Sequence, residues 1–94
     1  MKVKVEFSGG MELLFDKKKN LEVEVADGKT LGDLIAVLKA DYLKEKEELF
    51  VQGDTVRPGI IVLVNDTDWE LEGQEKYVLQ AGDTLAFIST LHGG

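Results

Sequence analysis

The chain has 94 residues, no cysteine and one histidine, a length that fits one domain with a modest core. The absence of thiols excludes disulfides, thiolate catalysis and cysteine-ligated metals. The formal net charge of −7 disfavours contact with a polyphosphate backbone, so no direct nucleic-acid binding is expected.

The first predicted element is a half-buried strand at residues 2–7, where Val3, Val5 and Phe7 share one face and charged residues the other. A turn at Ser8-Gly9-Gly10 follows, and the apolar residues 11–15 are expected to pack back on the sheet. Alternation at residues 21–25 predicts a second strand, antiparallel to the first.

The clearest helix is predicted from Thr30 to about Tyr42. Thr30 stands at the N-cap position with Asp33 three residues later, a variant of the capping box. The expected buried stripe has helical spacing and contains Leu31, Leu34, Ile35, Leu38 and Tyr42.

The second half of the chain predicts strands and turns. Residues 60–64 (IIVLV) are typical of a buried strand, and Asn65-Asp66 of the turn that ends it. Residues 69–71 are expected to form a short return strand, and residues 84–89 the final strand.

This order predicts an α+β fold, a β-grasp in which one main helix packs on one face of a mixed sheet. The first and last strands are expected to lie parallel at the sheet centre, joined by the long connection between them. We therefore expect a β-grasp domain at residues 1–89 and a flexible tail at residues 90–94 that ends in Gly-Gly.

The tail carries the candidate functional site. Without a Cβ, Gly93 and Gly94 can thread a narrow channel, and the carboxylate of Gly94 is then unhindered when an ATP-using enzyme adenylates it. Thr90, Leu91, His92 and Gly93 are the tail residues expected to enter that enzyme. A lone histidine has no evident partner for general base catalysis or metal binding.

The acidic residues 66–72 raise a calcium-loop alternative. Their spacing lacks the central glycine and distant glutamate of an EF-hand, so a turn and one solvated strand face explain them. The chain itself is expected to have no catalytic residue, no metal site and no cofactor.

The longest apolar run, residues 60–64, is far shorter than the ~20 residues that span a bilayer. The alternating N-terminus is not a signal peptide. We expect a monomer that does not bind membranes, located in the cytoplasm with the nucleus as a second compartment.

The sequence closely resembles the eukaryotic ubiquitin-related modifiers, a ubiquitin-like family related to the bacterial sulfur carriers of molybdopterin and thiamin synthesis. The resemblance runs nearly end to end and is carried by EFSGG at residues 6–10, LVNDTDWE at residues 63–70 and AGD through FISTLHGG at residues 81–94. The closing phrase is the most specific of the three.

The resemblance implies a mechanism. An activating enzyme of the ubiquitin-activating type, with a sulfurtransferase domain, would adenylate the Gly94 carboxylate, and persulfide sulfur would displace AMP to leave a thiocarboxylate. A tRNA thiolase complex would take that sulfur to make 2-thiouridine at the wobble position. The family also implies covalent attachment to lysines of target proteins.

Leu91-His92 lacks the arginines that ubiquitin's activating enzyme expects, so a different enzyme is implied. With nothing after Gly94, maturation by a protease is expected to be unnecessary. Three rival hypotheses stay open: a pure protein modifier without sulfur, the small subunit of a molybdopterin synthase, and a plain β-grasp interaction domain.

Overall fold

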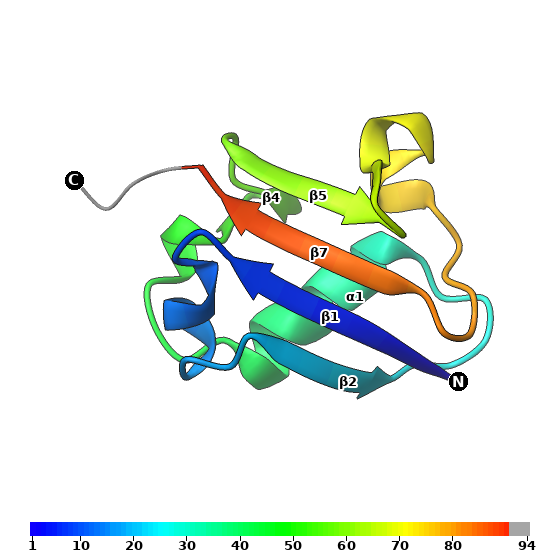
Figure 1. The fold of residues 1–94 in the computed structure, drawn as a ribbon, viewed down its shortest axis with the longest axis horizontal. Coiled ribbons are helices and arrows are strands. Elements are labelled where there is room, and N and C mark those ends of the chain that lie inside the picture. Colours follow the sequence, from blue (N-terminus) through cyan, green and yellow to red (C-terminus); the bar gives the residue numbers. More distant parts are fainter. Residues whose placement is uncertain (91–94) are drawn as a thin grey trace.

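The computed structural model describes residues 1–90. Five strands form one mixed sheet in the order β2-β1-β7-β5-β6 (Figure 1). Strands β1 and β7 lie side by side and parallel, and the other neighbours are antiparallel. Their bounds are Lys2–Ser8 (β1), Asn20–Glu24 (β2), Ile60–Val64 (β5), Thr67–Asp68 (β6) and Thr84–Ser89 (β7).

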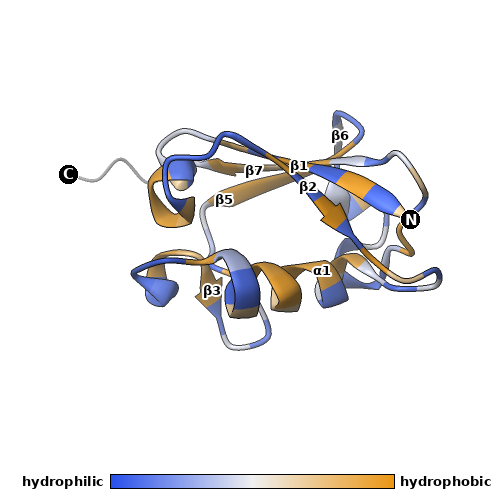
Figure 2. Ribbon diagram, turned by 90° about the horizontal axis from the view of Figure 1, so that it is seen from below, coloured by the Kyte–Doolittle hydropathy of each residue, from blue (hydrophilic) through white to orange (hydrophobic). Residues whose placement is uncertain are grey.

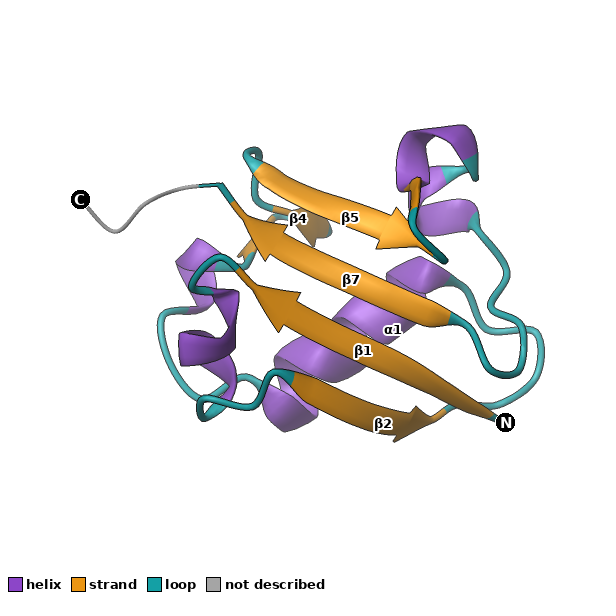
Figure 3. Ribbon diagram, viewed as in Figure 1, coloured by secondary structure: helices purple, strands orange, loops and turns teal. Residues whose placement is uncertain are grey.

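The main helix, α1, crosses one face of this sheet (Figure 3). It covers Leu31–Val37 and continues directly into a wider π turn, η2, at Leu38–Tyr42. The shorter elements are the 3₁₀ helices η1 (Met11–Phe15), η3 (Glu47–Leu49), η4 (Trp69–Leu71) and η5 (Gln74–Lys76) and the separate hairpin of β3 (Val51–Gln52) with β4 (Thr55–Val56).

The predicted capping box starts the helix. The Thr30 amide donates to Asp33 Oδ2 at 2.9 Å, and the Asp33 amide donates to Thr30 Oγ1 at 3.2 Å. Both bonds satisfy amides that have no partner within the helix. The predicted helical region is thus confirmed, with its second part more loosely wound.

The core lies between the sheet and a layer made of α1 and the β3–β4 hairpin (Figure 2). The predicted helix stripe is fully buried at Leu31, Leu34, Ile35 and Leu38. Val3, Val5 and Phe7 of β1 belong to the same buried cluster. The predicted β-grasp with parallel central strands is confirmed.

Two predictions were wrong. Residues 60–64 have the expected bounds, but the strand is buried on one face only, since Ile61 is 42% exposed. Residues 69–71 form the 3₁₀ helix η4, because β6 ends at Asp68, whose side chain accepts from the Glu70 amide at 2.9 Å and caps a helical turn.

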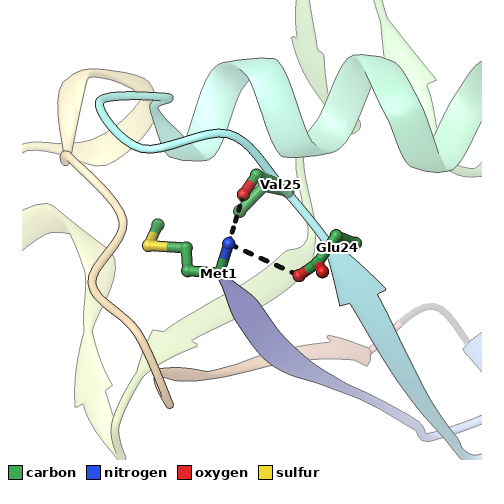
Figure 4. Close-up of polar contacts among 3 residues, drawn as sticks. All are labelled: Met1, Glu24 and Val25. Carbon is green, nitrogen blue, oxygen red and sulfur yellow. Dashed lines mark hydrogen bonds and ion pairs between the residues drawn. The ribbon is translucent and has the colours of Figure 1, made fainter.

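The N-terminus is fixed at the start of β1. The Met1 amine donates to the Val25 carbonyl oxygen at 2.9 Å and lies 3.4 Å from Glu24 Oε2 (Figure 4). These contacts extend the β1–β2 pairing to the first residue. The N-terminus and the end of β7 therefore lie at opposite ends of the sheet (Figure 1).

Candidate functional site

The predicted tail continues directly from β7, which lies between β1 and β5. Pairing with β5 runs to Ser89, which faces Ile60. One residue further, the Thr90 amide donates to the Gly59 carbonyl oxygen at 3.3 Å, and the Thr90 hydroxyl donates to the same oxygen. We call Ser89 and Thr90 the tail base, because they join the sheet to residues 91–94.

On the other side, the tail base lies against the turn after β1. Gly9 has a φ of +68°, and a Cβ placed on it would lie 2.2 Å from the Ser89 carbonyl oxygen. No carbon can stay that close to a backbone oxygen, so glycine is required here for space as well as for its conformation. The backbone of the turn after β1 is thus in direct contact with the backbone at the end of β7.

An aromatic cluster in the core includes one residue of β1 and one residue of β7, both close to the tail base. The rings of Phe7 and Phe15 stack with centroids 4.0 Å apart, while Phe50 meets Phe15 and Phe87 edge-on at 5.1 and 5.7 Å. Phe7 and Phe87 close the ring of contacts at 6.0 Å. Since Phe7 and Phe87 lie two residues before Gly9 and Ser89, this packing stabilises β1 and β7 close to the point where the chain leaves the sheet.

The outer face of the sheet is divided into two halves. Near β5 and β7 it is apolar, with the register pairs Ile61–Ile88 and Leu63–Ala86. Near β1 and β2 it is charged, and Lys2 and Lys4 face Glu24 and Glu22. The apolar half leads to the tail base, since Ile88 is two residues before Thr90.

A buried carboxylate marks the opposite end of β7. Asp83 is 6% exposed and accepts from Asn65 Nδ2 at 2.9 Å, the Gln80 amide at 2.8 Å and the Tyr77 hydroxyl at 2.7 Å. Burial raises the pKa of Asp83, but these three hydrogen bonds outweigh it, so the pKa lies below the usual value. Burial and the bond to Asp83 raise the pKa of Tyr77 to about 12.

This network is structural. The Asn65 side chain also accepts from the Thr84 amide at 2.9 Å, and Asn65 and Asp66 have φ values of 48° and 70°. Asp83 therefore holds the tight turn after β5 against the start of β7. Its hydrogen-bonding capacity is directed at the fold rather than at a substrate.

Within residues 1–90 there is no group of three or more histidine or acidic side chains arranged to hold a metal ion. A surface depression of about 540 Å³ is lined by Asp54, Gly73 and residues of η4 and η5, and none of them belongs to the tail base. None of the described helices is long and apolar enough to cross a bilayer.

Of the predicted site residues, only Thr90 lies among the described residues, where it is exposed and bonded to Gly59. Leu91, His92, Gly93 and Gly94 lie outside the described residues. Sequence reasoning placed Gly9 in a turn and in the EFSGG phrase of the resemblance, and Gly59 in a turn, but it assigned neither glycine a contact with the tail. The signal that pointed toward Gly9 was its place directly after a central strand.

Fold and tail base together define a ubiquitin-like β-grasp protein whose central strand β7 leads to the C-terminal residues. The model of the family Urm1 (Ubiquitin related modifier) matches residues 2–94. The chain therefore belongs to the ubiquitin-related modifier family.

Individual relatives agree with this assignment. A ubiquitin-related modifier 1 homolog of Dictyostelium discoideum is 59% identical over 100% of both chains. Ubiquitin-related modifier 1 of Mus musculus is 55% identical over 98% of this chain and 94% of its own. The solution structure of Urm1 from Trypanosoma brucei superposes with a TM-score of 0.86 at 47% identity, covering 99% of this chain and 95% of that one.

Proposed function

We propose that this ubiquitin-like modifier is a sulfur carrier whose reacting group is the carboxylate of Gly94. The carboxylate attacks the α-phosphorus of ATP in an activating enzyme, pyrophosphate leaves, and an acyl-adenylate results. Persulfide sulfur from the sulfurtransferase domain then displaces AMP and forms an acyl disulfide with that enzyme. A second thiol of the enzyme attacks the enzyme's sulfur atom in this bond, so the thiocarboxylate leaves and the two enzyme sulfurs remain as a disulfide. In this role the protein is a substrate and carrier, and it catalyses no step itself.

The observation that carries the proposal is the fixed exit of β7. A rigid globule that releases a short tail from its central strand can stay outside an enzyme while the tail enters. Residues 1–89 then act as the globule and residues 90–94 as the tail. With Thr90 bonded to Gly59, the four residues beyond it reach about 14 Å, which suits a buried catalytic site.

The absence of cysteine also supports sulfur chemistry at the main chain, because no side-chain thiol is available to carry the sulfur. The recipient is a tRNA thiolase complex that makes 2-thiouridine at the wobble position. With a net charge of −7, the carrier delivers sulfur to a protein and need not touch RNA. Cytoplasm and nucleus are the proposed compartments.

The same activated carboxyl group also reacts with amines. We include conjugation to lysines of target proteins in the proposal, since family membership favours a modifier over a fixed subunit of a cofactor enzyme. A denaturing pull-down should recover adducts that survive strong reducing agents and are lost when Gly94 is deleted.

The direct test is incubation with ATP and a candidate activating enzyme, followed by intact mass spectrometry. We expect one adenylyl group on the wild type and none on a variant lacking Gly94, whose circular dichroism should match that of the wild type. Adenylation of the deletion variant at the same rate would refute Gly94 as the reacting residue.

Sulfur carriage is tested separately from conjugation. Protein isolated gently from its native cells should contain a fraction in which one terminal oxygen is replaced by sulfur. In cells without the chromosomal copy, the wild type should restore 2-thiouridine in tRNA and a Gly94→Val variant should not. If protein from those cells contains no sulfur and tRNA thiolation is normal without it, the pure modifier is the better reading.

A further inference from the structure

We propose that Gly9, Gly59 and Thr90 form a clamp that positions the tail, fixing the point and direction at which residues 91–94 leave the sheet. They act as positioning residues for activation, and this role rests on the proposed function. The clamp itself is a property of the free protein and can be tested without any enzyme.

The first side of the clamp is a steric contact. The Cβ of any residue at position 9 would meet the Ser89 carbonyl oxygen at 2.2 Å and the Ser89 nitrogen and carbonyl carbon at 3.2 Å. These are backbone atoms, so no side-chain rotation relieves the collision, and the contact between the turn after β1 and the end of β7 must open. Gly10 has a φ of +99° as well, but a Cβ there would meet nothing within 4 Å. The requirement for space is therefore specific to the glycine that touches the tail base.

The second side is a pair of hydrogen bonds. The Thr90 amide and hydroxyl both donate to the Gly59 carbonyl oxygen, which continues the β5–β7 pairing one residue beyond Ser89. Gly59 has a φ of +100°, a conformation in which other residues are strained. The turn before β5 is thus shaped around a residue that can present its carbonyl to Thr90.

The contact at Gly9 and the hydrogen bonds to Gly59 together limit how far the tail can extend from the sheet. With Thr90 fixed, the four residues to Gly94 extend at most about 14 Å from it. Because the tail base is already ordered in the free protein, the activating enzyme does not have to order it on binding. Loosening the clamp should therefore weaken binding of the protein to the activating enzyme more than it slows the adenylation of Gly94.

The experiment compares Gly9→Ala with Gly10→Ala, a matched control that carries the same kind of backbone strain in the same turn without the collision. In the free proteins, hydrogen exchange at the Thr90 amide should be at least about fivefold faster in Gly9→Ala and close to wild type in Gly10→Ala. Equal exchange in the two variants overturns the clamp.

In adenylation assays, KM for Gly9→Ala should rise about five- to thirtyfold, the effect of having to order one more residue, while kcat stays within about twofold. An unchanged KM, or an equal change in Gly10→Ala, overturns the role in positioning. If the wild type is not adenylated at all, the proposed function fails, and the exchange measurement still decides whether the clamp exists.

A second pair of variants covers the case in which Gly9→Ala does not fold. Thr90→Val removes the hydroxyl but keeps the shape and the amide, and exchange and KM should both rise about two- to tenfold. Thr90→Ser restores the donor and should restore both values. A KM that changes without any change in exchange would mean that the hydroxyl acts on the enzyme directly, and the clamp would be rejected.

Discussion

The Tyr77 hydroxyl donates a 2.7 Å hydrogen bond to the Asp83 carboxylate and thereby ties the segment after η5 to the turn before β7. The pKa of the acid is lowered and that of the phenol is raised to about 12. The free energy of unfolding should therefore decrease both in acid, where Asp83 takes up a proton, and in alkali, where Tyr77 loses one.

In acid, protonation of Asp83 should destabilise the fold as the pH falls. Its folded pKa lies below the ordinary aspartate value of 3.8, so the unfolded chain takes up the proton first and unfolding becomes easier below about pH 4. In Asp83→Asn this part of the pH dependence should vanish. Urea unfolding of both proteins from pH 6 to pH 2.5 measures it; a constant difference in unfolding free energy across that range contradicts the assignment.

In alkali, Tyr77 should act in the opposite direction. Its pKa rises from 10.0 to about 12 on folding, so between these values the unfolded phenol ionises while the folded one stays neutral, and stability declines as pH rises. Tyr77→Phe should be less sensitive to pH over that window. Tyr42→Phe serves as the control for a tyrosine outside this network, and equal behaviour of the two variants would argue against the coupling.

Phe50 should be a sensitive member of the aromatic cluster, because it is fully buried and packs edge-on against two other rings. Phe50→Ala is expected to lower the free energy of unfolding by about 3–5 kcal/mol. Leu13→Ala, which truncates a side chain that is 56% exposed, should change it by less than about 0.5 kcal/mol. Similar losses in the two variants, measured by chemical denaturation, would show that the cluster contributes little.

Asn65 is held in a left-handed conformation with a φ of 48°. Asn65→Gly and Asn65→Ala both lose the bonds to Asp83 and Thr84, but only alanine adds backbone strain. Alanine should therefore be the less stable variant by about 1 kcal/mol, the reverse of the usual order of these two residues. A glycine variant that is equally or less stable, by calorimetry or urea unfolding, would place the importance of Asn65 in its side chain alone.

Thr30→Ala removes the side-chain half of the capping box and should cost about 1 kcal/mol. Thr30→Ser keeps the hydroxyl that accepts from the Asp33 amide and should be close to wild type. If serine and alanine prove equally destabilising, the β-branched shape of threonine matters more than the cap.

Much of the fold was predictable because hydrophobic periodicity reports burial directly. The faces of β1, the stripe of α1 and the bounds of β5 and β7 all follow from it. The outer face of β5 was missed because IIVLV (residues 60–64) is apolar at every position, so the pattern does not tell a strand buried on both faces from one with a half-exposed apolar face. The β3–β4 hairpin, with two residues in each strand, is too short for alternation to show.

The tail as the candidate site was predicted from composition, position and family resemblance, whereas its anchorage was not. Gly9 and Thr90 are far apart in the sequence, and their relation depends on the parallel pairing of β1 with β7. Close approach between two backbones leaves only one trace in a sequence, a glycine, and a glycine after a strand equally predicts an ordinary turn.

The central position of β7 has a mechanical consequence. A force that pulls Thr90 along the direction of β7 acts parallel to both neighbouring strands, β1 and β5. The hydrogen bonds on both sides of β7 then share the force, so they must break nearly together. At the far end of β1, the Met1 amine donates to the Val25 carbonyl oxygen and so ties the start of β1 to the residue after β2 (Figure 4). A pulling force that enters at the C-terminal end of β7 should therefore unfold this domain less readily than a force that separates an edge strand bond by bond.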